Sequence, residues 1–285
     1  MFKQSNFNNK TRPARKGWKK MQKVKVLTHR GIIGAEVRPL YFFKGLGEPV
    51  ADARIISFGA CNFACPYCKR DGAFRAPDGS IVSAIDCTIE DLLKVCDGAI
   101  AKRQVVRLSG GDPVVFPEAS VAIGEYVRKK GGRLSIAHNG SSPQFVKRMI
   151  DCGLESAAID LKGTRSDLGL RAGLKNGLGV KMYERSIETQ DILSSSGVFV
   201  DVRTPVFSNT TLDDLLEMAA SIVSGGNGDR EFWTLRLYKP VVGCDWDAPR
   251  NTESVIWMIE EVKKSYPNLK MGLRAKWEPE GFLYF

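Results

Sequence analysis

Three cysteines lie close together in the segment CNFACPYC, which follows a short apolar run at residues 54–58. Cys61, Cys65 and Cys68 offer three thiolates to one metal centre and no fourth. Four-iron clusters and structural zinc sites are usually held by four protein ligands, whereas a centre that performs chemistry keeps one position open. The spacing therefore favours a chemically active iron–sulfur centre. A zinc knuckle, or three thiols buried in a turn, is the alternative.

Polar motifs also follow the next apolar runs along the chain. The segment RLSGGDP ends one run, and its paired glycines would let the backbone approach a ligand closely. Its candidate residues are Ser109, Gly110, Gly111 and Asp112. The segment AHNG, with Asn139, and the segment IDLK, with Asp160 and Lys162, end the two runs after that. Arg203 lies within a further apolar run, where a cation without a partner would be costly, so a bound anion or a nearby acid is expected.

Regular structure must position these motifs, and the pattern of apolar residues predicts it. Short β-branched or apolar segments predict six strands, at residues 54–58, 104–108, 133–137, 156–161, 198–206 and 232–237. Amphipathic stretches between them predict helices that open at Thr88 and Thr211 or span residues 117–130, 183–195 and 252–266. Alternating strands and helices form parallel βαβ units, which predicts an α/β fold, a partial (β/α)6 barrel with its active site at the carboxyl ends of the strands. The segments 34–42 and 270–275 are strand-like, but the pattern does not place them.

The order of the motifs resembles that of the radical S-adenosylmethionine (SAM) superfamily, over about residues 54–275. The C-x3-C-x2-C spacing is similar to its cluster motif, and GGDP to its GGEP-like motif. The AHNG, DLK and VRTPV segments look like those of the glycyl-radical-enzyme activases, the pyruvate formate-lyase activating group. The resemblance implies an enzyme in which a 4Fe-4S cluster on the three cysteines binds SAM through its fourth iron. It also implies reductive cleavage to a 5′-deoxyadenosyl radical, hydrogen abstraction from a substrate, and an electron donor of the flavodoxin or ferredoxin type.

The same resemblance implies roles for individual residues in binding SAM. The backbone at Tyr67 would contact the adenine, and the SGGDP segment would bind the amino group of the methionine part. Lys162 would donate to the SAM carboxylate, and Asp160 would help to order the ribose or methionine end. Arg203 is a further candidate for the carboxylate, and Asn139 belongs to the motif shared with the activase group.

Two departures from the activase pattern leave the substrate open. The group commonly has Asp-Thr-Asn-Gly where this chain has alanine and His138 before Asn-Gly, and a histidine where this chain has Lys239. The substrate hypotheses are a backbone glycine of a partner enzyme, or a tRNA base, nucleotide or small metabolite. A hypothesis of another class is a non-catalytic metal-cluster protein that binds nucleic acid.

The net charge of +10 comes from the beginning of the chain. Ten Lys and Arg residues precede Glu36, the first acidic residue, and the remaining 32 basic and 32 acidic residues cancel. Residues 1–35 are therefore expected to form a basic, flexible extension, and residues 36–285 the barrel domain. The arm at residues 1–30 could contact RNA, steer a protein partner or only add solubility.

Composition favours a cytoplasmic enzyme. With 43% hydrophobic residues, a chain of 285 residues is long enough for one large domain. No apolar run approaches the roughly 20 residues that cross a bilayer, so no membrane contact is expected. The seven cysteines are an odd number, and four of them are scattered singly, which argues against a disulfide framework and for a reducing compartment.

Overall fold

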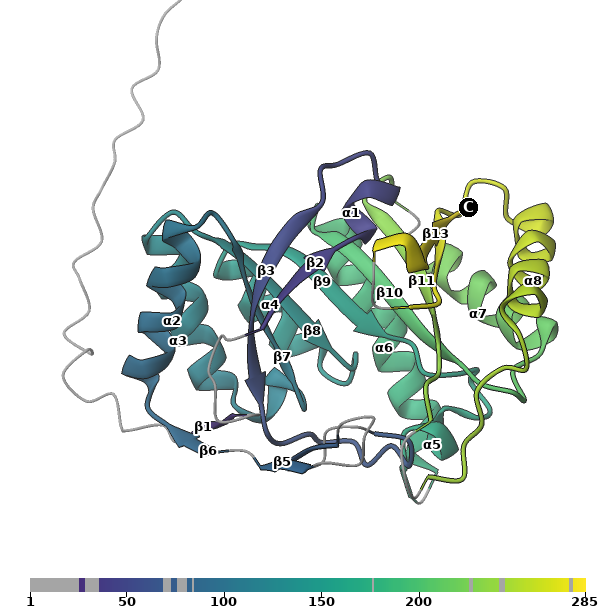
Figure 1. Ribbon diagram of the computed structural model, residues 1–285, viewed down its shortest axis with the longest axis horizontal. Helices are drawn as coiled ribbons and strands as arrows, with labels where there is room; N and C mark the ends of the chain where they lie inside the picture. Colours follow the sequence, from purple (N-terminus) through teal and green to yellow (C-terminus); the bar gives the residue numbers. More distant parts are fainter. Residues whose placement is uncertain are drawn as a thin grey trace, which may run out of the picture.

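The computed structural model describes residues 26–28, 36–68, 73–75, 81–83, 85–175, 177–225, 228–240, 244–276 and 279–285 (Figure 1). The basic extension expected over residues 1–35 lies outside the described residues, except for residues 26–28. Among the helices of the described residues, none is long and apolar enough to cross a membrane.

Parallel strands form the centre of the fold. In the described part of the chain there are seven, and they lie side by side in their order along the sequence. They are β3 (Ala51–Phe58), β7 (Val105–Gly110), β8 (Arg133–His138), β9 (Leu154–Asp160), β10 (Phe199–Val206), β11 (Glu231–Leu237) and β12 (Met271–Arg274). The six predicted strands are confirmed, and the unplaced segment 270–275 supplies the seventh. The curled sheet is the predicted partial barrel (Figure 1).

Helices connect successive parallel strands and cover the outer face of the sheet (Figure 1). They are α2 (Ile89–Ala101), α3 (Pro117–Lys129), α4 (Pro143–Asp151), α6 (Leu178–Ser195), α7 (Leu212–Ser224) and α8 (Thr252–Ser265). The five predicted helices are confirmed, and capping boxes at Thr88 and Thr211 begin α2 and α7. Helix α4 is not among the predicted helices, although Ser142 before Pro143 is a helix-start signal. Here Ser142 caps that helix by accepting the Phe145 N–H.

Shorter elements flank the barrel. They are β1 (Val26–Thr28), β2 (Val37–Leu40), β4 (Ala73–Arg75), β5 (Ile81–Ser83), β6 (Ile85–Cys87), β13 (Phe282–Tyr284), α1 (Phe42–Gly45), α5 (Leu168–Arg171) and 3-10 turns at Pro113–Val115 and Pro279–Gly281. Strands β1 and β2 pair antiparallel with β3, β6 pairs with β1, and β13 pairs with β12. Strands β4 and β5 form a two-stranded sheet of their own.

An apolar cluster closes the amino-terminal end of the barrel. Phe42 and Phe43 of α1 pack there with Phe232, at the beginning of β11, and with Phe282 of β13. The rings of Phe42 and Phe43 are stacked at 4.4 Å. The described part of the strand-like segment, residues 36–42, therefore runs from the first parallel strand to the last two and covers the end of the barrel opposite to the cysteines (Figure 1).

Side chains alternate between the two faces of each barrel strand. On β10, Val200 and Val202 pack into the large apolar core beneath the helices, so Asp201 and Arg203 face the barrel interior. By the same alternation, the interior also receives Arg107 of β7, Asp160 of β9, Thr234 and Arg236 of β11, and Arg274 of β12. The interior is therefore apolar at its amino-terminal end and strongly charged towards the carboxyl ends of the strands.

Candidate active site

The three cysteines lie on the loop that leaves the carboxyl end of β3, at the rim where the parallel strands end. Each is partly exposed and none is in a disulfide. The Phe63 N–H donates to Cys61 Sγ at 3.4 Å, and the Cys68 N–H donates to Cys65 O at 3.0 Å. Among the described residues, no three His, Cys, Asp or Glu side chains are grouped as ligands of a single metal ion. A four-iron cluster needs no such group, because each cysteine binds a different iron.

Burial makes a free thiolate unfavourable in this loop. Desolvation, with a smaller contribution from the Asp112 carboxylate, raises the pKa of Cys61 to about 12. Burial also raises the pKa of Cys65, and the nearby charge of Lys162 opposes this only in part. The thiols therefore keep their protons unless a cation replaces them, and coordination to a metal deprotonates a thiol outright. This donor set fits a metal cluster.

The paired glycines of the GGDP segment support the beginning of the cysteine loop. The Gly111 N–H donates to Phe58 O at 2.6 Å, and the N–H of the next residue donates to Ala60 O at 2.8 Å. Gly110 has a φ of +104°, and a Cβ there would lie 2.3 Å from the Phe58 nitrogen. A Cβ on Gly111 would lie 2.1 Å from Ala60 O. Only glycine fits at these two positions, so the motif has a structural task besides any contact with a ligand.

The Asp112 carboxylate joins two segments of the rim and is 1% exposed. Its Oδ1 accepts the Val114 N–H at 2.9 Å and lies 2.8 Å from His138 Nδ1, while its Oδ2 accepts the Asn139 N–H at 2.7 Å. His138 Nε2 accepts the Ser142 N–H at 3.2 Å. Because Nε2 accepts this bond, the hydrogen bond to Asp112 is donated from Nδ1. Asp112 thus connects β7 to the AHNG segment and, through His138, to the beginning of α4.

The Asn139 side chain connects the AHNG segment to the cysteine loop. Its Nδ2 donates to Asn62 Oδ1 at 2.7 Å and lies 3.8 Å from Cys61 Sγ, and its Oδ1 accepts the Ser141 N–H at 3.1 Å. Asn62 Nδ2 in turn donates to Ser141 Oγ at 2.8 Å. Sequence analysis does not single out Asn62 or Ser141, because asparagine and serine are common in any loop.

A segment after β9 holds the cysteine loop from another side. The Ala64 N–H donates to Ala172 O at 3.1 Å, just after α5. A Cβ on Gly173 would lie 2.0 Å from Ala64 O, so the two backbones are in close contact. Arg171, which is 3% exposed, forms an ion pair with Asp167 that orders this turn. The cysteine loop is therefore supported by the connections that follow three different strands.

Tyr67 anchors the loop in an aromatic cluster. Its ring centroid lies 4.7 Å from that of Phe207, 5.4 Å from that of Trp246 and 6.0 Å from that of Tyr238. Burial raises the pKa of Tyr67 above its usual range. The predicted contact with adenine concerns the backbone at this position, and the packing of the ring holds that backbone in place.

Lys162 and Asp160 form an ion pair beside the cysteine loop. Lys162 Nζ donates to Asp160 Oδ2 at 2.8 Å, and 12% of the lysine side chain is exposed. Burial opposes both charges, but their mutual attraction outweighs it, so the pKa of Asp160 is lowered and the pKa of Lys162 is raised well above its usual range. Cys65 also acts on the charge of Lys162. The ammonium is thus charged, close to the cysteines and available to an anionic ligand.

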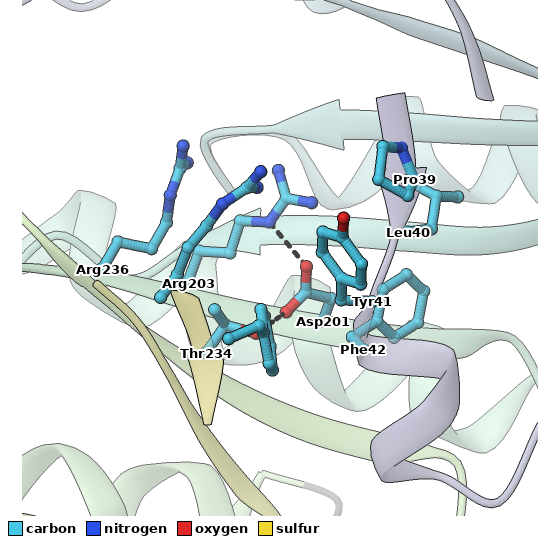
Figure 2. A pocket seen from close by; sticks show the side chains of 10 residues that line it. Pro39, Leu40, Tyr41, Phe42, Asp201, Arg203, Thr234 and Arg236 are labelled. Carbon is cyan, nitrogen blue, oxygen red and sulfur yellow. Dashed lines mark hydrogen bonds and ion pairs between the residues drawn. The ribbon is translucent and has the colours of Figure 1, made fainter. Parts of the chain in front are cut away.

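Arginines from three neighbouring strands, β10, β11 and β12, line a pocket in the barrel interior (Figure 2). Arg203 is opposite Asp160 in the strand register, and its Nε donates to Asp201 Oδ2 at 2.6 Å. Asp201 also accepts a hydrogen bond from Thr234. Figure 2 shows Arg203 and Arg236 extending in the same direction from neighbouring strands. The expected nearby acid for Arg203 is therefore Asp201, in a pocket that β2 and α1 cover.

Arg107 faces the same interior from β7 and is 2% exposed. Its Nη1 and Nη2 atoms have no hydrogen-bond partner among the described residues. Burial and the charge of Arg203 lower the pKa of Arg107, whereas Asp201 and Asp160 oppose that change. A guanidinium nevertheless keeps its proton in proteins, so this is a buried cation. Arg107 is not among the residues expected from the sequence, although it is a cation in an apolar run, as Arg203 is, and the same cost of an unpartnered charge applies to it.

Most of the predicted site residues meet at one rim. The cysteines, the SGGDP segment, Asn139, Asp160 and Lys162 all lie at or just beyond the carboxyl ends of neighbouring strands. Ser109 is opposite Ser57 of β3, and Arg203 of β10 is opposite Asp160. The roles of these residues towards SAM stay predictions. For Asp112, whose two oxygens already accept bonds from rim segments, the geometry indicates that it orders the rim.

The chain is similar to known proteins of one superfamily. The sequence model described as Radical SAM superfamily matches residues 55–222, which is more than half of the chain. A Methanocaldococcus jannaschii protein, named provisionally as a glycyl-radical enzyme activating enzyme, is 24% identical over 76% of this chain and 86% of its own length. A Methanothermobacter marburgensis protein, whose name as a GTP 3′,8-cyclase is also provisional, is 36% identical over 33% of this chain and 29% of its own length.

Solved structures share the fold at low sequence identity. SuiB of Streptococcus suis, in its SAM-bound structure, has a TM-score of 0.57 and 12% identity over 79% of this chain and 52% of its own. Methylornithine synthase (PylB) has a TM-score of 0.57 and 13% identity over 77% of this chain and 63% of its own. This chain therefore spans about half of SuiB and less than two thirds of the synthase, and the likeness concerns the partial barrel alone.

Proposed function

Because the chain belongs to the radical SAM superfamily, whose enzymes use a 4Fe-4S cluster and SAM, we propose that it cleaves SAM reductively and abstracts a hydrogen from a substrate. In this proposal Cys61, Cys65 and Cys68 hold the cluster, which supplies the electron for the cleavage. The observation that carries the proposal is the three-thiol loop, which Asn139, the paired glycines and the turn after α5 support from three sides. The protein's own residues bind and orient SAM and exclude water.

The residues around the loop divide into those that contact SAM and those that position the contacts. Lys162 donates to the SAM carboxylate, and Asp160 orders both the ammonium and the ribose or methionine end. The backbone at Tyr67 and the carbonyl groups of the SGGDP segment, with Ser109, meet the adenine and the amino group. Asp112 and Asn139 keep the rim segments in register with the cysteine loop, because their side chains already bind those segments.

Two substrate classes have support. The similarity to the Methanocaldococcus jannaschii protein supports a backbone glycine of a partner enzyme, as an activase would require. The buried and unpartnered guanidinium of Arg107 favours a small anionic molecule bound inside the barrel instead. The two predict different products, because an activase leaves a protein-bound radical and a metabolite enzyme leaves an altered small molecule.

Anaerobic reconstitution followed by incubation with SAM and dithionite tests the proposal. The expected products are 5′-deoxyadenosine and methionine, formed without any added substrate. The matched control is the chain with all three rim cysteines changed to alanine, which is expected to form neither. A protein that carries stoichiometric zinc and no iron after anaerobic purification, or a cluster-loaded protein that leaves SAM intact, would contradict the proposal. Replacing dithionite with reduced flavodoxin or ferredoxin then identifies the donor type.

We also propose that the basic arm contacts RNA. Each phosphate contact steepens the dependence of log affinity on log salt by about 0.7 to 0.9, so an arm that meets six or more phosphates should lose roughly a thousandfold between 50 and 200 mM salt. The deletion that tests this should stop at residue 25, because Val26–Thr28 pairs with β3 and β6. It should remove tRNA binding and leave SAM cleavage intact. Full-length protein that fails to bind tRNA at low salt would contradict the RNA contact.

A further inference from the structure

We propose that the barrel interior binds the carboxylate or phosphate group of an anionic small-molecule substrate through Arg107 and the arginines of β10 and β11. This inference rests on the proposed function, since it names the class of substrate from which the hydrogen is taken. The site lies between the apolar floor at Phe232 and the rim residues Asp160 and Lys162.

The Arg107 side chain is inside the barrel and not among the helices. Val106 and Leu108, its neighbours on β7, pack in the core beneath the helices, so the side chain between them takes the other face. Its register partners are Ile55 on β3 and Ser135 on β8. Arg203 and Asp201 take the interior face of β10 by the same alternation, and their charges act on Arg107 although β10 is three strands away in the sheet.

The described residues supply no hydrogen-bond partner for the terminal nitrogens of Arg107. A buried charge without a partner is strongly destabilising, and buried charges in native proteins are therefore paired or bind ions. The nearest carboxylates are already engaged, because Asp201 accepts bonds from Arg203 and Thr234, and Asp160 accepts one from Lys162. Two terminal nitrogens of one guanidinium are the geometry that binds a carboxylate or phosphate through two parallel hydrogen bonds.

The anion site at Arg107 lies apart from the site proposed for SAM. Arg107 precedes Gly110, at the end of β7, by three residues, which corresponds to roughly 10 Å along a strand. Lys162 lies at the rim beside Cys65, where it can meet the SAM carboxylate without the help of Arg107. An oxyanion bound at the depth of Arg107 leaves the rest of a small molecule to extend from there towards the rim. A protein segment would have to pass the rim and the loops above it to reach the same depth.

The test measures thermal unfolding of the cluster-loaded, full-length protein under anaerobic conditions. Wild type, Arg107→Met and Arg133→Met are compared in chloride, in phosphate and in citrate at equal ionic strength. Arg133 is the matched control because it lies on the neighbouring strand, is 44% exposed and pairs with Glu155. Phosphate and citrate in separate arms distinguish a phosphate ligand from a carboxylate ligand.

Wild type and Arg133→Met are expected to melt at a higher temperature in phosphate, in citrate or in both, and saturating SAM should leave that rise in place. Arg107→Met should melt above wild type in chloride, because the buried unpaired charge is gone, and should lose the response to anions, with an affinity at least about 10-fold weaker. Arg107→Lys is measured beside it and should keep a weakened response, because it keeps the charge.

Three results would overturn the inference. They are an unchanged anion response in Arg107→Met, a lower melting temperature of that variant in chloride, and loss of the wild-type response when SAM is bound. The last result would assign these arginines to SAM. Failure of the proposed function is seen separately, since a protein that responds to anions but leaves SAM intact has the anion site without the chemistry.

Discussion

Two buried charges of this barrel, one at the rim and one in the interior, stand in opposite environments. The Asp112 carboxylate meets three donors, two from backbone N–H groups and one from His138, whereas the Arg107 terminal nitrogens meet no acceptor within the described residues. A polar group that the fold satisfies contributes to stability, but one that the fold leaves unpaired costs stability. The two charges therefore have different roles. Asp112 at the rim holds loops in place, and Arg107 in the interior is suited to bind a ligand.

The largest effect is expected for the three cysteines proposed to hold the cluster. Cys61→Ala, Cys65→Ala and Cys68→Ala should each reduce the iron content from about four per chain to background and abolish SAM cleavage, because each removes one of only three protein ligands. Iron analysis after anaerobic reconstitution measures this. Cys152→Ala, which changes a buried cysteine at the end of α4, is the control and should keep the cluster. Retention of iron by any of the three rim variants would show that the cysteines are not the ligands.

The next prediction tests the contribution of the rim charge, Asp112, to stability, for comparison with that of the interior charge, Arg107. Asp112→Asn keeps the shape but turns one acceptor atom into a donor, which then faces a backbone N–H or the His138 proton. The variant should lose about 2–3 kcal/mol of unfolding free energy, measured with urea, since a buried donor is left unsatisfied. Asp151→Asn, at an exposed position at the end of α4, should change stability by no more than about 0.5 kcal/mol.

A loss at Asp112 together with a gain for Arg107→Met would establish the contrast between the two charges. If Asp112→Asn is instead as stable as the control, the carboxylate is not a structural connector, and the predicted direct contact with SAM becomes the better account of it.

The same contrast explains how much could be predicted from the sequence. The strands and most helices follow from local periodicity, and the convergence of the Cys61 loop with Lys162 follows from the rule that parallel strands end at one rim. The partners of those residues depend on contacts between distant segments. Asn62 is ordinary in a loop until Asn139 lies against it, 77 residues later. Arg107, like Arg203, is a cation in an apolar run, but only the neighbouring strands show that it points inwards.

A smaller effect is expected at the ion pair beside the loop. Lys162→Ala should weaken SAM binding roughly 10- to 100-fold, the value of one charge-assisted hydrogen bond, and should leave the iron content unchanged. Equilibrium binding of SAM to the reconstituted protein measures this. Lys181→Ala, an exposed lysine of α6, should bind SAM like wild type. Normal SAM affinity in Lys162→Ala would mean that the DLK segment does not play the part that its resemblance implies.

The last effect appears only as the pH rises and concerns a third buried group, Glu231, which shows how a buried acid differs from a buried arginine. Glu231 lies at the beginning of β11 and is 3% exposed. Its Oε1 accepts from Gln190 at 2.6 Å, while its Oε2 has no partner among the described residues. Burial raises the pKa of Glu231 from 4.5 to about 7. The acid can therefore remove its own charge by binding a proton, which the guanidinium of Arg107 cannot do.

The stability effects of changing Glu231 and of changing Arg107 should therefore depend differently on pH. Between about pH 4.5 and pH 7 the folded protein binds more protons at Glu231 than the unfolded chain does, so the contribution of this group to stability falls as the pH rises, by up to about 3 kcal/mol in total. Glu231→Gln should remove that fall, so that urea unfolding shows a variant more stable than wild type near pH 8 and similar to it near pH 4.5. Glu260→Gln, an exposed change on α8, should follow wild type.

The gain in stability from Arg107→Met should instead be the same across this pH range, because no proton is exchanged at Arg107. A gain from Arg107→Met that varied with pH like that of Glu231→Gln would mean that the interior arginine titrates, and the reason for assigning it an anionic ligand would be gone.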